Sequence, residues 1–210
     1  MASLLEQKME DAEMSLKDLV NKHAFGDGTG NGGKDLSGLQ LMVSAAGTYG
    51  NIDRAEDINY WWRAQVVNGA GALAVSGAVG MVQMYNDCGS GQGSMTPDGI
   101  LTSQDQYQNY ETNMLSKFRY TAAAEANRVF ANDNMKFRRA MLMWDHECPK
   151  DRMYFLNSKV IKYLVNTGKD FQMRPFQIPP NQDSKTAHRL LYCQLVCRNC
   201  RHLGLIHGLT

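Results

Sequence analysis

The sequence predicts a mixed α+β fold, and three observations carry this prediction. Apolar residues near the N-terminus recur at spacings of three and four, which is the period of one helix face. The last third instead contains short runs rich in β-branched and aromatic residues, separated by turn residues. The chain has 210 residues, of which 43% are hydrophobic, so it can bury a core as one large domain or two small lobes.

The first element is a helix predicted from Ser3 to Lys22, in which Ser3 and Glu6 form a capping box. The residues that share its apolar face are Leu5, Met9, Ala12, Leu16 and Leu19. Five glycines between Gly26 and Gly33 then stop the helix and open a flexible turn. A short apolar segment follows from Leu36 to Val43.

The middle of the chain combines a turn, an aromatic cluster and a second helix. The segment from Tyr49 to Arg54 is typical of a turn. Tyr60, Trp61 and Trp62 are consecutive large rings, and we expect burial of both indoles to anchor this loop. On that prediction, replacing either Trp by Ala costs about 3 to 5 kcal/mol of stability. The segment from Asn68 to Tyr85, rich in Ala and other small residues, is predicted to be helical.

The remaining elements are mostly strands. Ile100 to Thr102 is predicted to be a short buried strand, and Ser103 to cap a helix that runs to about Lys117. The later runs predicted to be strands or extended segments are Phe137–Trp144, Met153–Asn157, Val160–Val165, Phe171–Ile178 and Leu190–Cys197.

The overall charge excludes several classes of partner. Lys and Arg number 22 against 21 Asp and Glu, so the long-range field that draws proteins to nucleic acid or anionic membranes is missing. The sequence has no run of about 20 apolar residues and no signal-peptide pattern, which predicts a protein that is cytosolic at synthesis and makes no membrane contact. The five cysteines are expected to be reduced thiols.

One segment approaches a nucleotide-binding motif. Gly28 to Lys34 matches the G-x4-G-K frame of a phosphate-binding loop. The next residue is Asp35, where the motif requires a hydroxyl for magnesium, and its carboxylate would repel phosphate. The segment also follows a helix instead of a strand. A solvent-exposed hinge is therefore the preferred interpretation.

A second candidate is a cluster of Cys193, Cys197, Cys200 and His202, because thiolates and imidazole in a short span can hold zinc. On a strand, Cys193 and Cys197 share one face and Cys200 lies on the other, so the three thiolates do not converge without a bulge. No second ligand pair lies nearby in the sequence. The preferred interpretation is that these cysteines are small buried hydrophobic residues.

The third candidate is Trp144 to Cys148, which contains an acid, a base and a thiol. Sequence neighbours seldom face one another as catalytic partners do, so this segment is predicted to be a turn between strands. His23, His188 and His207 are isolated and are expected to be ordinary surface or core residues. The sequence thus assigns no catalytic, cofactor-binding or metal-binding residue and predicts no cofactor and no enzymatic activity.

Several segments, read as an ordered set, resemble the major capsid protein of tailed bacteriophages, the family with the Hong Kong 97-type fold. They are the helix from Glu6 to Leu19 with the turn FGDGT, then LSGLQLMV, TYGNIDRAEDINYWWR, DGILTSQDQYQNYE, DRMYFLNSK and AHRLLYCQLVCRNCRHLGLIHGL. Together they cover most of the chain. The tryptophan pair with Arg63 and the run MYFLN are the most particular of them.

The resemblance implies a peripheral domain with a long spine helix and an extended sheet, and an axial domain with a central sheet flanked by helices. It places residues 1–35 in the spine helix and turn of the peripheral domain and residues 36–150 mainly in the axial domain. Residues 151–210 then form strands that return through both domains.

The resemblance also implies a structural subunit that self-assembles into pentamers and hexamers of an icosahedral shell around double-stranded DNA. Its main partner is then itself, with portal, scaffolding and decoration proteins as further candidates. Packaged DNA is contacted only weakly, in agreement with the near-neutral charge. The protein is expected in the virion capsid, after assembly in the host cytoplasm. The alternative is a small nucleotide- or zinc-dependent enzyme that uses the Gly28–Lys34 loop or the Cys193–His202 cluster.

Members of this family usually carry an N-terminal arm and a long β-hairpin before the spine helix, whereas Met1 stands here at the start of that helix. The chain is accordingly expected to be a fragment, a processed form or a shortened relative. The arm and hairpin supply much of an interface that needs about 1,000 Å² or more. We therefore expect this chain alone to be monomeric or to form weak small oligomers.

Overall fold

The computed structural model describes residues 4–75, 77, 80–89, 95–115, 135–180, 182 and 184–210 of the chain. The chain divides into two compact units, each with helical and strand elements of its own. Unit 1 consists of Met1–Gly38 and Lys162–Val196, and unit 2 consists of Leu39–Ile161 and Cys197–Thr210.

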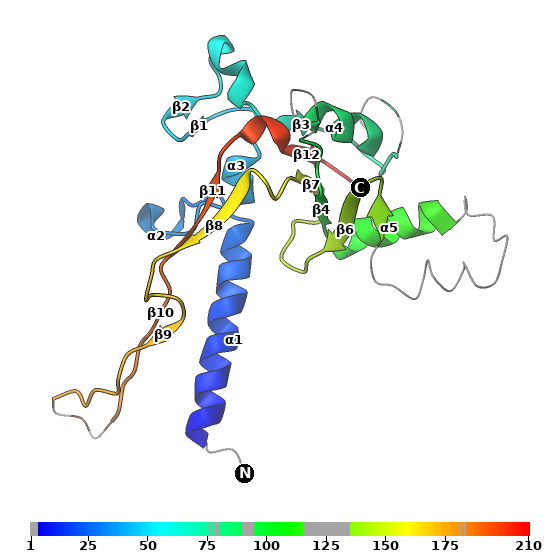
Figure 1. Ribbon diagram of the computed structural model, residues 1–210. Helices are drawn as coiled ribbons and strands as arrows, with labels where there is room; N and C mark the ends of the chain where they lie inside the picture. The colour runs from blue at the N-terminus through cyan, green and yellow to red at the C-terminus, as the bar shows by residue number, and fades with distance from the viewer. Residues whose placement is uncertain are drawn as a thin grey trace. The chain divides into compact units, whose positions relative to one another are not determined.

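Unit 1 is built on one long helix, α1 (Leu4–Ala24), with two small sheets beside it (Figure 1). Glu6 in its first turn and Lys22 in its last turn complement the helix dipole. The three- and four-residue spacing of the apolar side chains also favours a helix. One sheet pairs β8 (Ile161–Val165) with β11 (Cys193–Cys197), and the other pairs β9 (Gln172–Met173) antiparallel with β10 (Arg189–Leu190).

A close backbone approach fixes the end of α1. A Cβ on Gly38 would lie 2.5 Å from the carbonyl oxygens of His23, Ala24 and Gly26, so a side chain at this position would collide with the helix C-terminus. Phe25 is buried at the same corner. Between Phe25 and Gly38 the chain makes a single helical turn, α2 (Gly30–Gly33).

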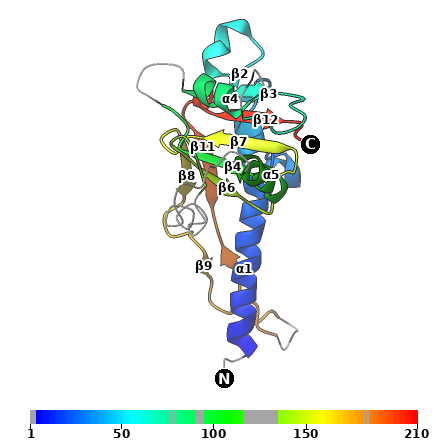
Figure 2. The same cartoon turned by 90° about the vertical axis from the view of Figure 1, so that its right-hand side faces the viewer.

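Unit 2 is centred on a mixed six-stranded sheet with the strand order β3-β12-β7-β4-β6-β5 (Figure 2). The pairs β3–β12 and β4–β6 are parallel, and the other three pairs are antiparallel. The strands are β3 (Gln65–Val67), β4 (Gly99–Thr102), β5 (Lys136–Phe137), β6 (Ala140–Trp144), β7 (Arg152–Leu156) and β12 (Gly204–His207).

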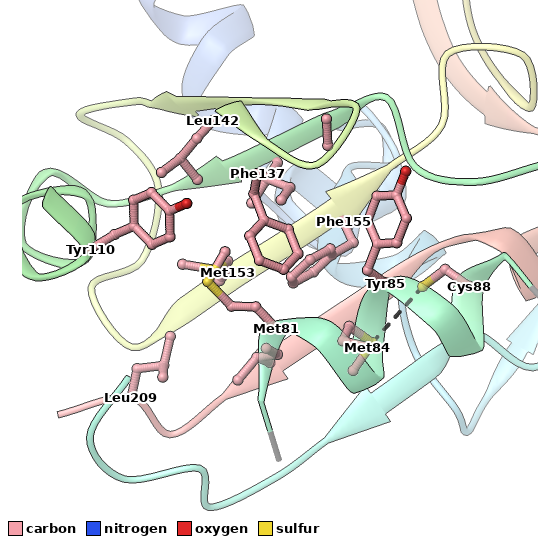
Figure 3. Close-up of a cluster of buried hydrophobic side chains, with 13 residues drawn as sticks. Met81, Met84, Tyr85, Cys88, Tyr110, Phe137, Leu142, Met153, Phe155 and Leu209 are labelled. Atoms are coloured by element: carbon pink, nitrogen blue, oxygen red, sulfur yellow. Dashed lines mark hydrogen bonds between the residues drawn. The ribbon is translucent and has the colours of Figure 1, made fainter. Parts of the chain in front are cut away.

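The core of unit 2 lies on the face of this sheet that is covered by α4 (Met81–Cys88) and α5 (Gln104–Leu115). Figure 3 shows the side chains of α4 directed toward those of the strands. Alternate residues of each strand enter this core, as the two-residue period of a strand requires. The buried cluster consists of Met81, Met84, Tyr85, Cys88, Ile100, Tyr110, Phe137, Ala140, Leu142, Met153, Phe155, Ile206 and Leu209.

The remaining elements of unit 2 are short. They are α3 (Leu39–Met42), the antiparallel pair β1 (Thr48–Tyr49) and β2 (Ile52–Asp53), and two 3-10 helices, η1 (Asp57–Trp62) and η2 (Cys200–His202). Gly50 and Asn51, both with φ of 62°, form the tight turn between β1 and β2, which confirms the predicted turn.

The first helix and the strands predicted at Ile100–Thr102, Met153–Asn157 and Val160–Val165 are confirmed to within a few residues. The run Phe171–Ile178 is a strand only at Gln172–Met173, and the run Leu190–Cys197 is divided between β10 and β11. The predicted strand from Phe137 to Trp144 is a hairpin, because Arg138 has a φ of 54° and turns the chain between β5 and β6. The predicted cap at Ser3 and the predicted helix end at Lys117 lie outside the described residues. Ser103 does stand at the start of α5, where its carbonyl accepts the N–H of Tyr107 at 3.0 Å.

The predicted helix from Asn68 to Tyr85 is wrong over most of its length. Among its described residues, only those from Met81 onward are helical, in α4. Gly69, Gly71 and Gly77 have φ values of 67°, 65° and 112°, which interrupt a right-handed helix. Within the segment, the N–H groups of Ala70 and Gly71 donate to the carbonyls of His207 and Gly208 at 3.2 and 3.0 Å, so pairing with the C-terminal segment prevails over the helical composition.

Candidate interaction surfaces

The carboxylate of Asp35 occupies the space inside the glycine-rich loop that follows α1. A Cβ on Gly30 would lie 2.0 Å from Oδ2 of Asp35, so this carboxylate occupies the space beside the loop backbone. Thr29 donates from its N–H and its hydroxyl to Oδ1 of Asp27, at 3.0 and 2.8 Å, which lowers the pKa of that carboxyl. Two negative groups thus stand where a phosphate would need donors.

The cysteine cluster separates into different environments. Cys193 begins β11 and belongs to unit 1. Cys197 ends that strand and Cys200 begins η2, and both belong to unit 2. His202 directs Nδ1 to the carbonyl of Cys88 at 3.0 Å. Over the described ranges, no group of three or more His, Cys, Asp or Glu residues could hold a metal ion.

The acid–base–thiol segment is a turn between β6 and β7, as predicted. The Glu147 N–H donates to Oδ1 of Asp145 at 2.8 Å, so that carboxylate closes the turn. Burial raises the pKa of Cys148 to about 12, which keeps its thiol protonated and unreactive at neutral pH. Among the other histidines, His207 pairs with Asp151 at 2.9 Å.

The aromatic cluster is an exposed surface, which corrects the predicted burial of both indoles. Ile58, Tyr60 and Trp61 of η1 are 77%, 66% and 48% exposed. Trp62 alone turns inward, where its indole N–H donates to the Tyr49 carbonyl at 3.0 Å and its ring stacks on Tyr49 at 6.2 Å. We call the exposed residues Ile58, Tyr60 and Trp61 the aromatic turn.

A buried arginine, Arg54, holds the loops next to the aromatic turn. Arg54 is 1% exposed, and its guanidinium donates to the carbonyls of Leu41, Met42, Ser44 and Gly47 at 2.9 to 3.1 Å. Arg63 in turn donates to the carbonyls of Arg54 and Ala55. The planar Arg54 guanidinium donates to several loop carbonyls at once, so the aromatic turn is attached to a rigid part of unit 2.

Unit 1 presents a second apolar surface because it has almost no core. Phe25 is the one buried hydrophobic residue among its described residues, and α1 buries none. The exposed hydrophobic side chains, which we call the unit 1 apolar face, are Leu4, Leu5, Met14, Leu19, Tyr163, Leu164, Phe176, Ile178 and Tyr192. A monomer rarely leaves so many large apolar groups in water, which indicates a protein–protein contact.

Unit 1 contains a groove of about 710 Å³ between α1 and the β8–β11 sheet. Leu16, Leu19 and Val20 line it from the helix, and Leu164 and Leu191 from the other wall. Half of the lining residues are aliphatic, and the lining also includes His23 and Asp35, whose Nδ1 and Oδ1 are 3.8 Å apart. Such a groove suits an apolar segment of another protein better than a polar small molecule.

Comparison with solved structures gives matches that cover nearly the whole chain. The capsid asymmetric unit of cyanophage A-1(L) matches 98% of this chain and 69% of that chain, with 17% identity and a TM-score of 0.73. The capsid of a native GTA particle matches 98% of this chain and 66% of that one, with 9% identity and a TM-score of 0.56. No protein-family model and no curated protein matches the sequence.

A third structure gives the same result. The procapsid of satellite phage P4, which includes the size determination (Sid) protein, matches 100% of this chain and 65% of that chain, with 8% identity and a TM-score of 0.53. The chain therefore spans about two thirds of the length of these solved chains. It has the fold of phage capsid proteins, which confirms the α+β fold that the resemblance implies. No described helix is both long and apolar enough for a membrane crossing.

Proposed function

We propose that this chain is a structural subunit of an icosahedral capsid, without an enzymatic role. The observation that carries the proposal is the capsid fold, matched over 98% of the chain at a TM-score of 0.73. The same comparison supports self-association as the basic activity of the chain.

The distribution of apolar side chains supports this proposal independently. Unit 1 leaves its apolar face in water, and unit 2 leaves the aromatic turn in water. A shell subunit must make contacts with several copies of itself, through different patches that close into rings. A unit that lacks its own core becomes stable when such contacts cover it, because the buried apolar area contributes about 25 cal/mol per Å².

The finer features of the shell belong to the same proposal. We infer that the subunits form pentamers and hexamers, with unit 1 as the peripheral domain and unit 2 as the axial domain. The formal charge of +1 supports a container whose inner surface binds double-stranded DNA only weakly. We further propose the virion as the location, assembly in the host cytoplasm, and portal, scaffolding and decoration proteins as partners.

The proposal is tested by the assembly behaviour of the purified chain. Sedimentation velocity and negative-stain electron microscopy are recorded at increasing concentration, with and without a crowding agent. We expect monomers or weak small oligomers, with the oligomers increasing with concentration and crowding. Binding of stoichiometric zinc or of a magnesium nucleotide by a chain that shows no association at any concentration contradicts the proposal.

A further inference from the structure

A second groove of unit 1 combines apolar side chains with basic ones. It has a volume of about 250 Å³ and lies between α1 and the β9–β10 pair. We call it the basic groove and define it by five of its lining residues: the apolar Met9, Met173 and Phe176 and the basic Lys8 and Lys185. Among the described residues that line it, none carries a carboxylate.

Two cations of the basic groove are not neutralised by the described part of the chain. Arg189 also lines the groove, but it pairs with Glu13. Lys8 and Lys185 are exposed and have no ion pair with any described residue. They flank Phe176, whose side chain is 42% exposed. The groove therefore favours a partner that is both apolar and anionic.

The aromatic turn of unit 2 has the complementary chemistry. Glu56 and Asp57 are exposed and stand directly before its large side chains. The Asp57 carboxylate accepts from Arg63 at 3.2 Å, and the Asp57 side chain remains fully exposed. The Glu56 carboxylate accepts from the Asn59 amide at 3.2 Å. Neither contact covers its carboxylate, so one short segment presents two anions together with the exposed apolar side chains of the aromatic turn.

The side chains of the basic groove are also of the kinds that bind aromatic rings. Thioether sulfurs pack favourably at ring edges, and Met9 and Met173 are both partly exposed. Ammonium groups are attracted to the faces of aromatic rings, which suits Lys8 and Lys185. A ring such as that of Trp61 can thus meet sulfur and cationic nitrogen together, while the carboxylates beside it meet the same cations.

We propose that the aromatic turn of one copy of this chain docks into the basic groove of a second copy, with Glu56 and Asp57 beside Lys8 and Lys185. The partner is a second copy because the side chains of the aromatic turn are 48% to 77% exposed in the single chain, and Phe176 of the groove is 42% exposed. The inference rests on the proposed self-association and adds which two surfaces meet. Because these surfaces differ, the contact is heterologous and repeats from copy to copy, as a shell subunit requires.

The size of this contact predicts its strength. Tyr60 and Trp61 can each bury about 150 to 250 Å² of surface. This area is well below the roughly 1,000 Å² that a stable interface needs. The contact is therefore weak by itself and is populated at high protein concentration, in agreement with the weak small oligomers expected of this chain.

The first test needs no substitution. The full chain is prepared in isotopically light and heavy forms, mixed at high concentration, and treated with a water-soluble carbodiimide, which joins a carboxylate directly to a contacting lysine amine. Mass spectrometry then maps the linked tryptic peptides. We expect links between light and heavy chains from Glu56 or Asp57, which share the tryptic peptide 55–63, to Lys8 or Lys185. Links from this peptide only within one label, or only to other lysines, would overturn the proposal.

The second test reverses the charges. Lys8→Glu combined with Lys185→Glu should weaken association at least about tenfold in sedimentation velocity, because like charges then face each other across the contact. Adding Glu56→Lys and Asp57→Lys to the same chain should restore association to within about twofold and also restores the net charge. Arg63 keeps its two carbonyl acceptors in this variant, so the turn should remain folded, and circular dichroism checks this.

Lys159→Glu combined with Lys162→Glu is the matched control. It changes the net charge by the same amount at two exposed lysines that do not line the basic groove, and its association should equal that of the unchanged chain. If it associates as weakly as the groove variant, net charge governs the contact and the proposal is wrong.

The remaining outcomes separate this contact from the proposed function. If the unchanged chain associates but the four-residue variant does not recover, the contact is wrong and the capsid subunit stands. If the unchanged chain associates at no concentration, the contact is wrong as well. The capsid subunit is then contradicted only when zinc or nucleotide binding accompanies that result.

Discussion

Gly204 of β12 lies directly against Met84 of α4. A Cβ on Gly204 would be 2.5 Å from Sδ of Met84 and 2.6 Å from Sγ of Cys88, and both of these residues are at most 1% exposed. Because Gly204 has no side chain, α4 can approach the sheet closely at this position. The thioether of Met84 fills the space that remains, 3.9 Å from Cys88 (Figure 3).

We therefore expect Gly204→Ala to destabilise the protein by about 1 to 3 kcal/mol, because the packed helix has to shift to admit a methyl group. Gly99→Ala is the matched control on β4 of the same sheet, where a Cβ would meet only Cε of Met143 at 3.6 Å. Its effect should stay within about 0.5 kcal/mol. Urea unfolding followed by circular dichroism measures both, and equal losses would contradict the close approach at Gly204.

The buried thiol of Cys88 makes stability fall in alkaline solution. Burial raises its pKa from 9.0 to about 12, so between these values the folded chain binds a proton that the unfolded chain has lost. The free energy of unfolding should thus be unaffected by this thiol below pH 9 and fall above it, by up to about 1.4 kcal/mol per pH unit.

Cys88→Ala removes this contribution and should make the decline between pH 9 and 11 less steep, while the equally raised pKa of Cys148 maintains a part of it. From pH 7 to 8 the free energy of unfolding should depend on pH equally in the two proteins, because the thiol is almost fully protonated in both the folded and the unfolded chain. This range therefore serves as the control. A decline that is as steep in Cys88→Ala as in the unchanged chain would assign the alkaline sensitivity to other groups.

The two tryptophans of η1 should differ in their effect on stability. Trp62→Phe removes the indole N–H that donates to the Tyr49 carbonyl and should cost about 1 to 2 kcal/mol. Trp61→Phe is the matched control, because its indole is 48% exposed, and its cost should stay below about 0.5 kcal/mol. Denaturant midpoints of the two variants measure these differences. A stability loss for Trp61→Phe as large as for Trp62→Phe would indicate that both rings are buried, as the sequence predicted.

The tryptophan pair shows why the sequence predicted some features and missed others. Periodicity is local, so it predicted α1 and the strands around Ile100 and Tyr154 correctly. Burial depends on which loops fold over a residue, and the position of Trp61 follows from the Arg54 guanidinium, whose acceptors lie 7 to 13 residues earlier in the chain. A spacing pattern contains no signal for such a contact.

The cysteine cluster shows the same limit. Strand parity places Cys193 and Cys197 on one face and Cys200 on the other. The strand ends at Cys197, and the 3-10 helix η2 begins at Cys200, so the parity of a continuous strand does not apply to Cys200.

The unit 1 apolar face should control self-association, because it is the largest group of hydrophobic side chains in unit 1 without a core behind it. Leu19→Asp places a charge in the groove of α1, where a partner would have to desolvate it. We expect at least a tenfold weaker association, equivalent to about 1.4 kcal/mol, in sedimentation velocity. Leu19 is already 48% exposed, so the unfolding midpoint should change little.

Gln7→Asp is the matched control for this prediction. It adds the same charge to the same helix at an exposed position, on the side of α1 opposite to the groove residues Leu16, Leu19 and Val20. Association of Gln7→Asp should equal that of the unchanged chain. If both variants associate equally weakly, net charge and not the groove governs assembly. If Leu19→Asp associates as tightly as the unchanged chain, the contact between subunits lies elsewhere, and the aromatic turn becomes the surface to change next.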